Sequence, residues 1–244
     1  TNIATTITGF PPLPPFIDEP NSFHNRGYLY GQTSLPERVR WTLGLSYDSF
    51  DRDGYMIERV NPKVGVQWDV TDAFQLRAAA FQVVKPALAA NRTIEPTQVA
   101  GFNQLFDDVN GTVSQRYGVG LDWRIRNDLF VGAEATWRTL QEPVDFIDEF
   151  LVASVIMEDR REMLHRAYVN WLPVPTIALS AEFVYDRYDS QKSVDPDLPF
   201  TVETISVPLG LRYFHDSGFF ASLGGTYVHQ TVERSSSSLR AQGA

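Results

Sequence analysis

Apolar and polar residues alternate strictly along residues 116–138, and this stretch is the clearest signal in the sequence. Two runs of about ten residues flank a short polar turn, Arg126-Asn127-Asp128. One face of the pair carries Tyr117, Val119, Leu121, Trp123, Ile125, Leu129, Val131, Ala133, Ala135 and Trp137. Period-two alternation predicts a β-hairpin with one apolar and one polar face. About ten residues is also the length that a tilted strand needs to cross a bilayer.

The same alternation recurs along the chain and predicts ten strands in all. The others lie at about residues 25–33, 38–47, 64–70, from Phe74 onward, and at about 161–172, 177–186, 205–213 and 219–227. Consecutive strands joined by short turns pair antiparallel. We therefore predict an all-β fold, an antiparallel transmembrane β-barrel with about ten strands visible, which forms part of a larger barrel.

The connections differ in length in a regular way. Short turns are expected near residues 35, 72, 127, 174 and 216. Longer polar connections are expected near residue 52, at 85–112, 140–160 and 187–201, and after 232. Outer-membrane barrels have short periplasmic turns and longer external loops, whereas a β-sandwich does not sort its loops in this way. Residues 98–105 could form a strand, but a full span there would invert the alternation, so we assign them to the external loop, as a strand extension above the membrane.

Aromatic residues cluster near the strand ends, where a membrane protein meets the lipid–water interface. Four Trp residues lie near the short turns, and other aromatic residues lie near the opposite ends. The predicted membrane-interface aromatics are Trp41, Trp68, Trp123, Trp137, Trp171, Tyr185 and Tyr213. A soluble sheet would more often bury its Trp residues in mid-strand, so the two belts favour the membrane barrel.

Composition narrows the possible functions further. The 244 residues include no Cys, and no run of 18 apolar residues is present to form a membrane-spanning helix. The net charge of −9 excludes nucleic acid as an expected partner. The opening TNIATTITGF lacks the basic and apolar regions of a signal peptide. We expect a Pro-rich external loop at residues 1–24, barrel strands and loops at 25–232, and a polar loop at 233–244 that ends at a truncation point.

The polar faces of the predicted strands supply candidate lumen residues. They are Arg40, Asp69, Arg77, Asp122, Arg124, Glu134, Arg138, Arg166, Glu182 and Arg212. Two interpretations remain open, a mutually paired lumen wall and a specific ligand site. In the long loop, the candidates for contact with a ligand are Gln98, Phe102, Asn103, Gln104, Asp107 and Asp108. The alternative for this loop is a lid that packs on itself.

A family resemblance rests on residues 92–108, RTIEPTQVAGFNQLFDD, followed by Tyr117-Gly118-Val119-Gly120. Together with the aromatic-rich hairpins, this segment resembles the C-terminal part of TonB-dependent-receptor-like barrels. It is more similar still to barrels fused behind tetratricopeptide repeats in Gram-negative bacteria. The resemblance covers residues 25–232. Within these 244 residues we expect neither the plug nor the TonB-interacting segment of a receptor, and the family's barrel has about twice as many strands.

The resemblance implies a bacterial outer-membrane location and uptake of a bulky ligand such as an iron chelate, or passage of a polymer in the repeat-fused relatives. The expected partners are outer-membrane lipid and a plug or repeat domain of the same protein. We expect a transport pore gated by external loops or a plug. The alternatives are a membrane anchor or adhesin and, less favoured, an outer-membrane hydrolase. The four His residues, His24, His165, His215 and His229, form no recognisable catalytic or metal-ligand motif, so no enzyme, metal or cofactor is expected.

Overall fold

The chain folds as an all-β protein in a computed structural model, which describes residues 22–52, 55–86, 95–104, 107–147, 153–190 and 199–234. Among these residues, no helix is long and apolar enough to cross a membrane. The strands are β1 (Ser22–Ser34), β2 (Val39–Arg52), β3 (Tyr55–Thr71), β4 (Phe74–Val84), β5 (Gln98–Val99), β6 (Phe102–Asn103), β7 (Val113–Arg126), β8 (Leu129–Ile147), β9 (Ala153–Val174), β10 (Ile177–Ser190), β11 (Thr201–Phe214) and β12 (Phe220–Glu233).

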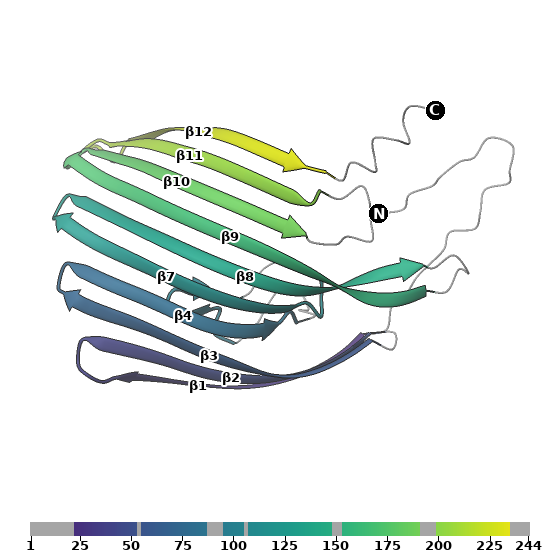
Figure 1. Ribbon diagram of the computed structural model, residues 1–244. Coiled ribbons are helices and arrows are strands. Elements are labelled where there is room, and N and C mark those ends of the chain that lie inside the picture. The colour runs from purple at the N-terminus through teal and green to yellow at the C-terminus, as the bar shows by residue number, and fades with distance from the viewer. Residues whose placement is uncertain are drawn as a thin grey trace, which may run out of the picture.

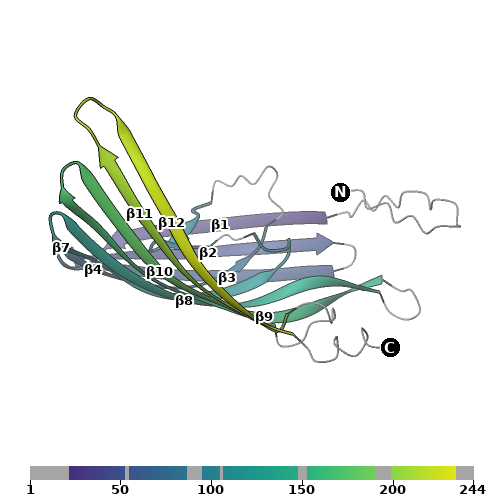
Figure 2. The same ribbon diagram turned by 90° about the horizontal axis from the view of Figure 1, so that it is seen from above.

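Ten of these strands form one antiparallel sheet, in the order β1-β2-β3-β4-β7-β8-β9-β10-β11-β12. Figure 1 shows the strands side by side, and Figure 2 shows that the sheet curves into an open trough with β1 and β12 at its two edges. The sheet does not close on itself. The sequence-based prediction of ten barrel strands is therefore confirmed for the described residues, and β5 and β6 form a separate small hairpin.

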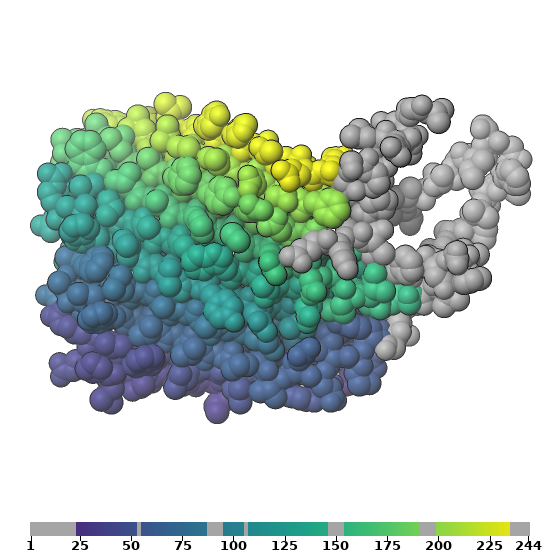
Figure 3. Space-filling model, viewed as in Figure 1, coloured from purple at the N-terminus to yellow at the C-terminus, as the bar shows by residue number. Residues whose placement is uncertain are grey.

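In the strands after β1, the predicted alternation places the apolar row on the convex face, whereas β1 turns Tyr28 and Tyr30 toward the concave face. In β7 and β8, Val119 pairs with Ala135 and Trp123 pairs with Val131. Val119 and Trp123 are 50% and 47% exposed, although both are apolar. The convex surface in Figure 3 is continuous, with the strands as successive bands from purple to yellow. A wide apolar surface of this kind is typical of a sheet whose outer face contacts lipid.

The short turns lie where the sequence predicts them, but two predicted loops are wrong. Strand β3 begins at Tyr55, three residues after β2 ends at Arg52, so no long loop lies near residue 52. Strand β8 continues to Ile147 and β9 begins at Ala153, so most of residues 140–160 is strand. β9 has 22 residues, about twice the length that a bilayer requires, so the β8–β9 pair extends beyond it.

The sheet forks between β3 and β4. Their pairing ends at Lys63 and Phe81, next to Pro62, which has no N–H to donate to a ladder. Beyond that point β3 pairs only with β2, as far as Tyr55 opposite Arg52, while β4 continues along β7 to Val84 opposite Val113. In Figure 1, β1 to β3 accordingly diverge from β4 toward the ends of the strands that lie away from the short turns.

A charge placed in the middle of the convex face should be costly. Ala133 lies on β8 in the lipid-facing row, so we expect Ala133→Arg to destabilise the complete protein in lipid vesicles by about 2–4 kcal/mol. Ser206→Arg, on the concave face of β11, should have a much smaller effect because its side chain faces the lumen. Urea unfolding in vesicles checks this, and equal effects of the two changes would contradict the assignment of the faces.

Candidate functional site

A short hairpin folded onto the concave face of the sheet is the main candidate site. We call residues 95–104 the inner hairpin, and it contains β5, β6 and a two-residue turn at Ala100 and Gly101, both with positive φ (49° and 87°). Figure 2 shows β5 and β6 inside the curve of the sheet. Residues 98–105 were expected to extend a wall strand above the membrane. That expectation is wrong, because residues 98–103 instead form a hairpin that packs against the inner wall.

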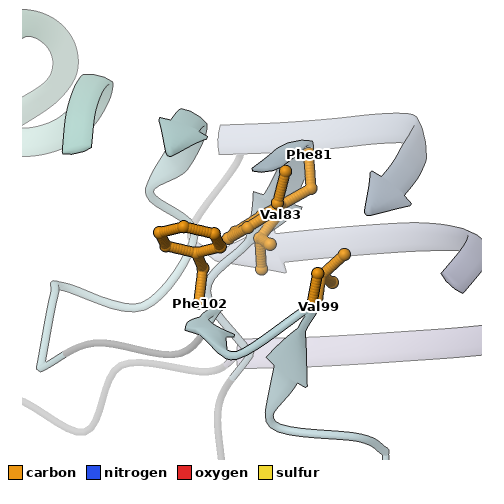
Figure 4. Packing of buried hydrophobic residues seen from close by; sticks show 6 residues of the cluster. Phe81, Val83, Val99 and Phe102 are labelled. Carbon is orange, nitrogen blue, oxygen red and sulfur yellow. The ribbon is translucent and has the colours of Figure 1, made fainter. Parts of the chain in front are cut away.

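Apolar contacts hold the tip of the inner hairpin against the wall (Figure 4). The cluster combines hairpin and β4 residues, namely Val99, Ala100, Phe102, Ala79, Phe81 and Val83, all at most 8% exposed. Two glycines in the wall make this close approach possible. A Cβ added at Gly118 would lie 2.6 Å from the Phe102 ring, and one at Gly65 would lie 2.7 Å from the Ala100 Cβ. We call the six apolar residues of the hairpin and β4 the apolar cluster.

The base of the inner hairpin is held by ionic contacts around Glu95. Its carboxylate accepts hydrogen bonds from Lys63 Nζ at 2.7 Å and from the Tyr30 hydroxyl at 2.5 Å, and pairs with an Arg26 guanidinium nitrogen at 2.9 Å. The Glu95 and Lys63 side chains are 1% and 0% exposed. Buried charges require such complete pairing, because an unpaired charge in this environment would be strongly unfavourable. We call these four residues the Glu95 cluster.

Asp48 supports the Glu95 cluster from β2. This fully buried carboxylate pairs with Arg26 Nε at 3.2 Å and lies 2.9 Å from His24 Nε2. It also accepts hydrogen bonds from Asn61 Nδ2 at 2.6 Å and Ser46 Oγ at 3.2 Å. Asp48 therefore fixes the position of Arg26, which in turn reaches Glu95.

A third attachment involves the C-terminal side of the hairpin and the residues that follow it. Arg116 donates a hydrogen bond to the Asn103 carbonyl at 2.9 Å. Arg138 pairs with Asp108 at 2.5 Å and with Glu162 at 2.6 Å. These contacts come from β7 and β8, so the hairpin and Asp108 are bound to five of the ten wall strands, β1, β3, β4, β7 and β8, and β2 supports them through Arg26.

Beyond the inner hairpin, the concave wall carries mutually paired charges. Arg77 pairs with Asp122 at 2.9 Å and with Glu134 at 3.0 Å, and its guanidinium lies 5.0 Å from the centre of the Phe102 ring. On β9 and β10, Arg166 pairs with Glu182 at 2.5 Å. A cavity of about 530 Å³ lies between these pairs and the turn at Gly101. The wall thus presents both signs of charge to the lumen.

The extension of β8 and β9 beyond the membrane has its own ion pairs. Arg160 contacts Glu142 and pairs with Glu158 at 3.1 Å. Burial raises the pKa of the Glu142 carboxyl, and the charge of Arg160 partly opposes this effect. These charges stabilise a strand pair that has no lipid to support it.

The six loop residues expected to contact a ligand divide into two groups. Phe102 and Gln104 are 1% and 2% exposed, and Asp108 is bound to Arg138, so these three attach the loop. Gln98 and Asn103 are exposed and hydrogen-bonded to each other at 3.0 Å, and Asp107 is exposed. Only the second group is accessible to a solute in the lumen.

The remaining candidate lumen residues and the interface aromatics can also be located. Near the short turns, Arg40 lies 3.7 Å from Asp69 and Arg124 donates to the Asp72 carbonyl at 3.2 Å, while Arg212 is exposed. The five Trp residues and Tyr213 are between 37% and 47% exposed on the convex face, and Tyr185 bonds to Glu203 at 3.1 Å. Their role at a membrane interface remains a prediction.

The residues of the Glu95 cluster were not identified as a site from the sequence. Arg26 and Tyr30 lie on β1, Lys63 on β3 and Glu95 before β5, so no local spacing joins them. In the sequence, only the alternation along β3 indicates that Lys63 faces the lumen, because Lys63 continues the polar row that contains Gly65. Within the described residues, no group of three His, Cys, Asp or Glu side chains could hold a metal.

A curved antiparallel sheet with an apolar convex face and a charged concave face defines the class of an outer-membrane β-barrel. The family profile described as "TonB dependent receptor-like, beta-barrel" matches residues 2–139, more than half of the chain. The chain therefore belongs to the TonB-dependent receptor-like β-barrel family, whose members are bacterial outer-membrane proteins. No curated protein matches the sequence significantly.

Solved structures of outer-membrane receptors share the fold. The FrpB iron transporter of Neisseria meningitidis superposes with a TM-score of 0.57 at 12% identity, covering 88% of this chain and 39% of that protein. The alcaligin outer-membrane receptor FauA of Bordetella pertussis gives 0.51 at 12%, covering 87% and 45%. The ferripyoverdine receptor of Pseudomonas aeruginosa, bound to ferripyoverdine, gives 0.51 at 11%, covering 87% and 32%. The chain thus spans less than half the length of these relatives.

Proposed function

We propose that this chain forms part of the lumen wall of an outer-membrane transport receptor, and that the inner hairpin is a fixed constriction of the transport path. The main observation is the position of the hairpin on the concave face, where the apolar cluster, the Glu95 cluster and the Arg116 and Arg138 contacts hold it. A segment attached at three places is not free to act as a moving lid.

Several features of the wall support a path for solutes. Arg77, Glu134, Arg166 and Glu182 surround a cavity of about 530 Å³ beside the hairpin turn. Interleaved positive and negative charges suit the passage of a hydrated polar solute, and they influence which ions enter. The solved relatives are described as receptors or transporters for alcaligin, iron and ferripyoverdine, so an iron chelate is the substrate class that we propose.

Gating is then assigned to other parts of the complete protein. Since the inner hairpin is held by buried ion pairs, opening it would expose charged groups that lose their partners. We propose that a plug or other external loops open and close the path, and that the hairpin sets its minimum width. A plug of the same protein would lie against the concave face, where the exposed Gln98 and Asn103 side chains are available for contact.

Deleting residues 87–111 in the complete protein tests the constriction. We expect larger single-channel conductance in planar bilayers and faster entry of an iron chelate into proteoliposomes, because the lumen becomes wider. The control is Glu37→Ala, an exposed residue at the short-turn end. Unchanged permeability together with lost binding of an external partner would contradict the transport proposal and favour the adhesin alternative.

A further inference from the structure

The convex face has a hollow at the fork between β3 and β4. It has a volume of about 410 Å³, and its apolar lining includes Leu43, Pro62, Val64, Ala80 and Tyr117. Its position follows from the topology, because pairing between β3 and β4 stops at Lys63 and Phe81. The hollow therefore lies on the lipid-facing side of the sheet, in the row of exposed apolar side chains.

Side-chain amides close the fork where the backbone ladder has ended. Gln115 donates to Gln82 Oε1 at 3.1 Å, and Gln82 Nε2 donates to Asn61 Oδ1 at 2.9 Å. Gln82 and Gln115 both line the hollow. The hollow thus has an apolar floor and a rim of side-chain amides that form hydrogen bonds.

A second cavity adjoins this rim. It has a volume of about 320 Å³, and its outward-facing lining includes Gln115, Thr139, Gln141, Asp159 and Arg161, all of them exposed. Gln115 lines both cavities, so the apolar hollow and the polar cavity adjoin at this residue. Tyr117 and Trp137 lie two residues below Gln115 and Thr139 on the same face, so the polar cavity lies above the aromatic belt.

Arg160 and Arg161 both line the polar cavity, but Arg160 is held by Glu142 and Glu158, so Arg161 is the cation that faces a ligand there. Its register partner on β10 is Asp189, but Arg187 already holds that carboxylate by two contacts, at 2.8 and 3.1 Å. Asp159 is the acidic group of the cavity, and it accepts a hydrogen bond from Gln141 at 3.4 Å. A ligand headgroup here would thus meet the Arg161 guanidinium, the Asp159 carboxylate and several neutral donors.

We propose that these two cavities form a binding site for one membrane lipid that carries a phosphate group. An acyl chain lies in the hollow at the fork, the phosphate contacts Arg161 and the Gln115 amide, and an amino or hydroxyl group of the headgroup donates to Asp159. Both the position of the site and its chemistry suit a lipid. The convex face of an outer-membrane barrel is covered by lipid, and Arg binds phosphate well because its planar donors match the phosphate oxygens. The order from apolar floor to amide rim to charged cavity matches the order within a lipid.

Native mass spectrometry of the complete protein in detergent tests this site, with dipalmitoyl phosphatidylethanolamine as the added lipid. We expect one lipid per chain that survives detergent exchange. Ala80→Trp, which fills the hollow, should remove it, and Arg161→Ala should weaken binding about tenfold, as the loss of a charge-assisted hydrogen bond predicts. Ala133→Trp, the same change elsewhere on the convex face, and Arg38→Ala, an exposed cation at the short-turn end, should bind as the wild type does.

Two further probes separate the parts of the ligand. Dipalmitoylglycerol, which lacks the phosphate, should bind about as weakly as phosphatidylethanolamine binds to Arg161→Ala, and inorganic phosphate should not compete. Equal retention by wild type and a folded Ala80→Trp variant would overturn the proposal, and so would equal binding of the two lipids. A dimer that forms without lipid and is abolished by Ala80→Trp would also overturn it, because a second copy would then occupy the hollow. Circular dichroism establishes folding, and Arg161→Ala tests the site at an exposed position if Ala80→Trp does not fold.

Discussion

Glu95→Ala is expected to detach the base of the inner hairpin and to widen the lumen. The substitution removes the carboxylate that binds Lys63, Arg26 and Tyr30 together. Lys63 remains buried, with Ser46 Oγ at 3.1 Å as a neutral hydrogen-bond acceptor. Removing one partner of a buried ion pair costs about 3–5 kcal/mol, because the charge left behind is neither hydrated nor compensated. Arg26 retains Asp48, so the lower part of that range is expected here.

The loss of stability in Glu95→Ala should be confined to the inner hairpin and should not unfold the whole sheet. The ten-stranded sheet keeps its backbone ladder, whereas the inner hairpin has only two residue pairs of its own. The hairpin is therefore the part that opens, and amide hydrogen exchange should accelerate at residues 97–104. In the complete protein, single-channel conductance should rise in parallel.

Two variants separate the role of the charge from the general effects of mutation. Glu95→Gln keeps an oxygen that can accept hydrogen bonds from Tyr30 and Lys63 but removes the charge, so an intermediate effect is expected. Glu37→Ala removes an exposed carboxylate and should change neither exchange nor conductance. If Glu95→Ala left exchange in the hairpin at the wild-type rate, the Glu95 cluster would not be what holds it.

The sequence predicts the wall of this protein well, for a clear physical reason. In the membrane, one face of each strand contacts lipid and the other faces the lumen, so the sequence alternates strictly, as in β7 and β8. Above the membrane both faces of β8 and β9 contact water or protein, and the alternation disappears. Residues 140–147 and 153–160 therefore resemble a polar loop in the sequence although they continue the two strands.

The inner hairpin could not be predicted because its strands are too short and its partners too distant. Two-residue strands such as β5 and β6 give no periodic pattern. The contacts that hold them join positions as far apart as Tyr30 and Gln104, or Asp108 and Arg138. The apolar residues of the segment did indicate packing, but they could not show that its partner was the lumen wall.

Two glycines in the wall partly indicate where the inner hairpin packs. Gly65 and Gly118 lie directly under the hairpin tip, where any side chain would collide with Ala100 or Phe102. Glycine usually weakens a strand interior, so its presence often marks the close approach of another segment. Gly118 belongs to the Tyr117-Gly118-Val119-Gly120 motif, and its position under Phe102 gives a physical reason for a glycine there.

Gly118→Val should therefore dislodge the tip of the inner hairpin without changing the hairpin itself. The new Cβ would lie 2.6 Å from two carbon atoms of the Phe102 ring, and the ring cannot withdraw easily because it is packed in the apolar cluster. Overpacking of this kind costs about 1–3 kcal/mol. Hydrogen exchange at Val99 and Phe102 should accelerate, and conductance of the complete protein should rise. Gly27→Val is the matched control, because no atom lies within 4 Å of the added Cβ.

A compensating change distinguishes this steric mechanism from a general weakening of β7. Phe102→Ala alone should destabilise the hairpin by about 3–5 kcal/mol, because a large side chain that is 1% exposed leaves a cavity. In the double variant, the valine at position 118 extends into the space that the ring has vacated. The double variant should therefore be destabilised by less than the sum of the two single variants. Strict additivity in this cycle would show that Gly118 acts through the strand and not through Phe102. The close approach of Phe102 would then not be the reason for a glycine at position 118.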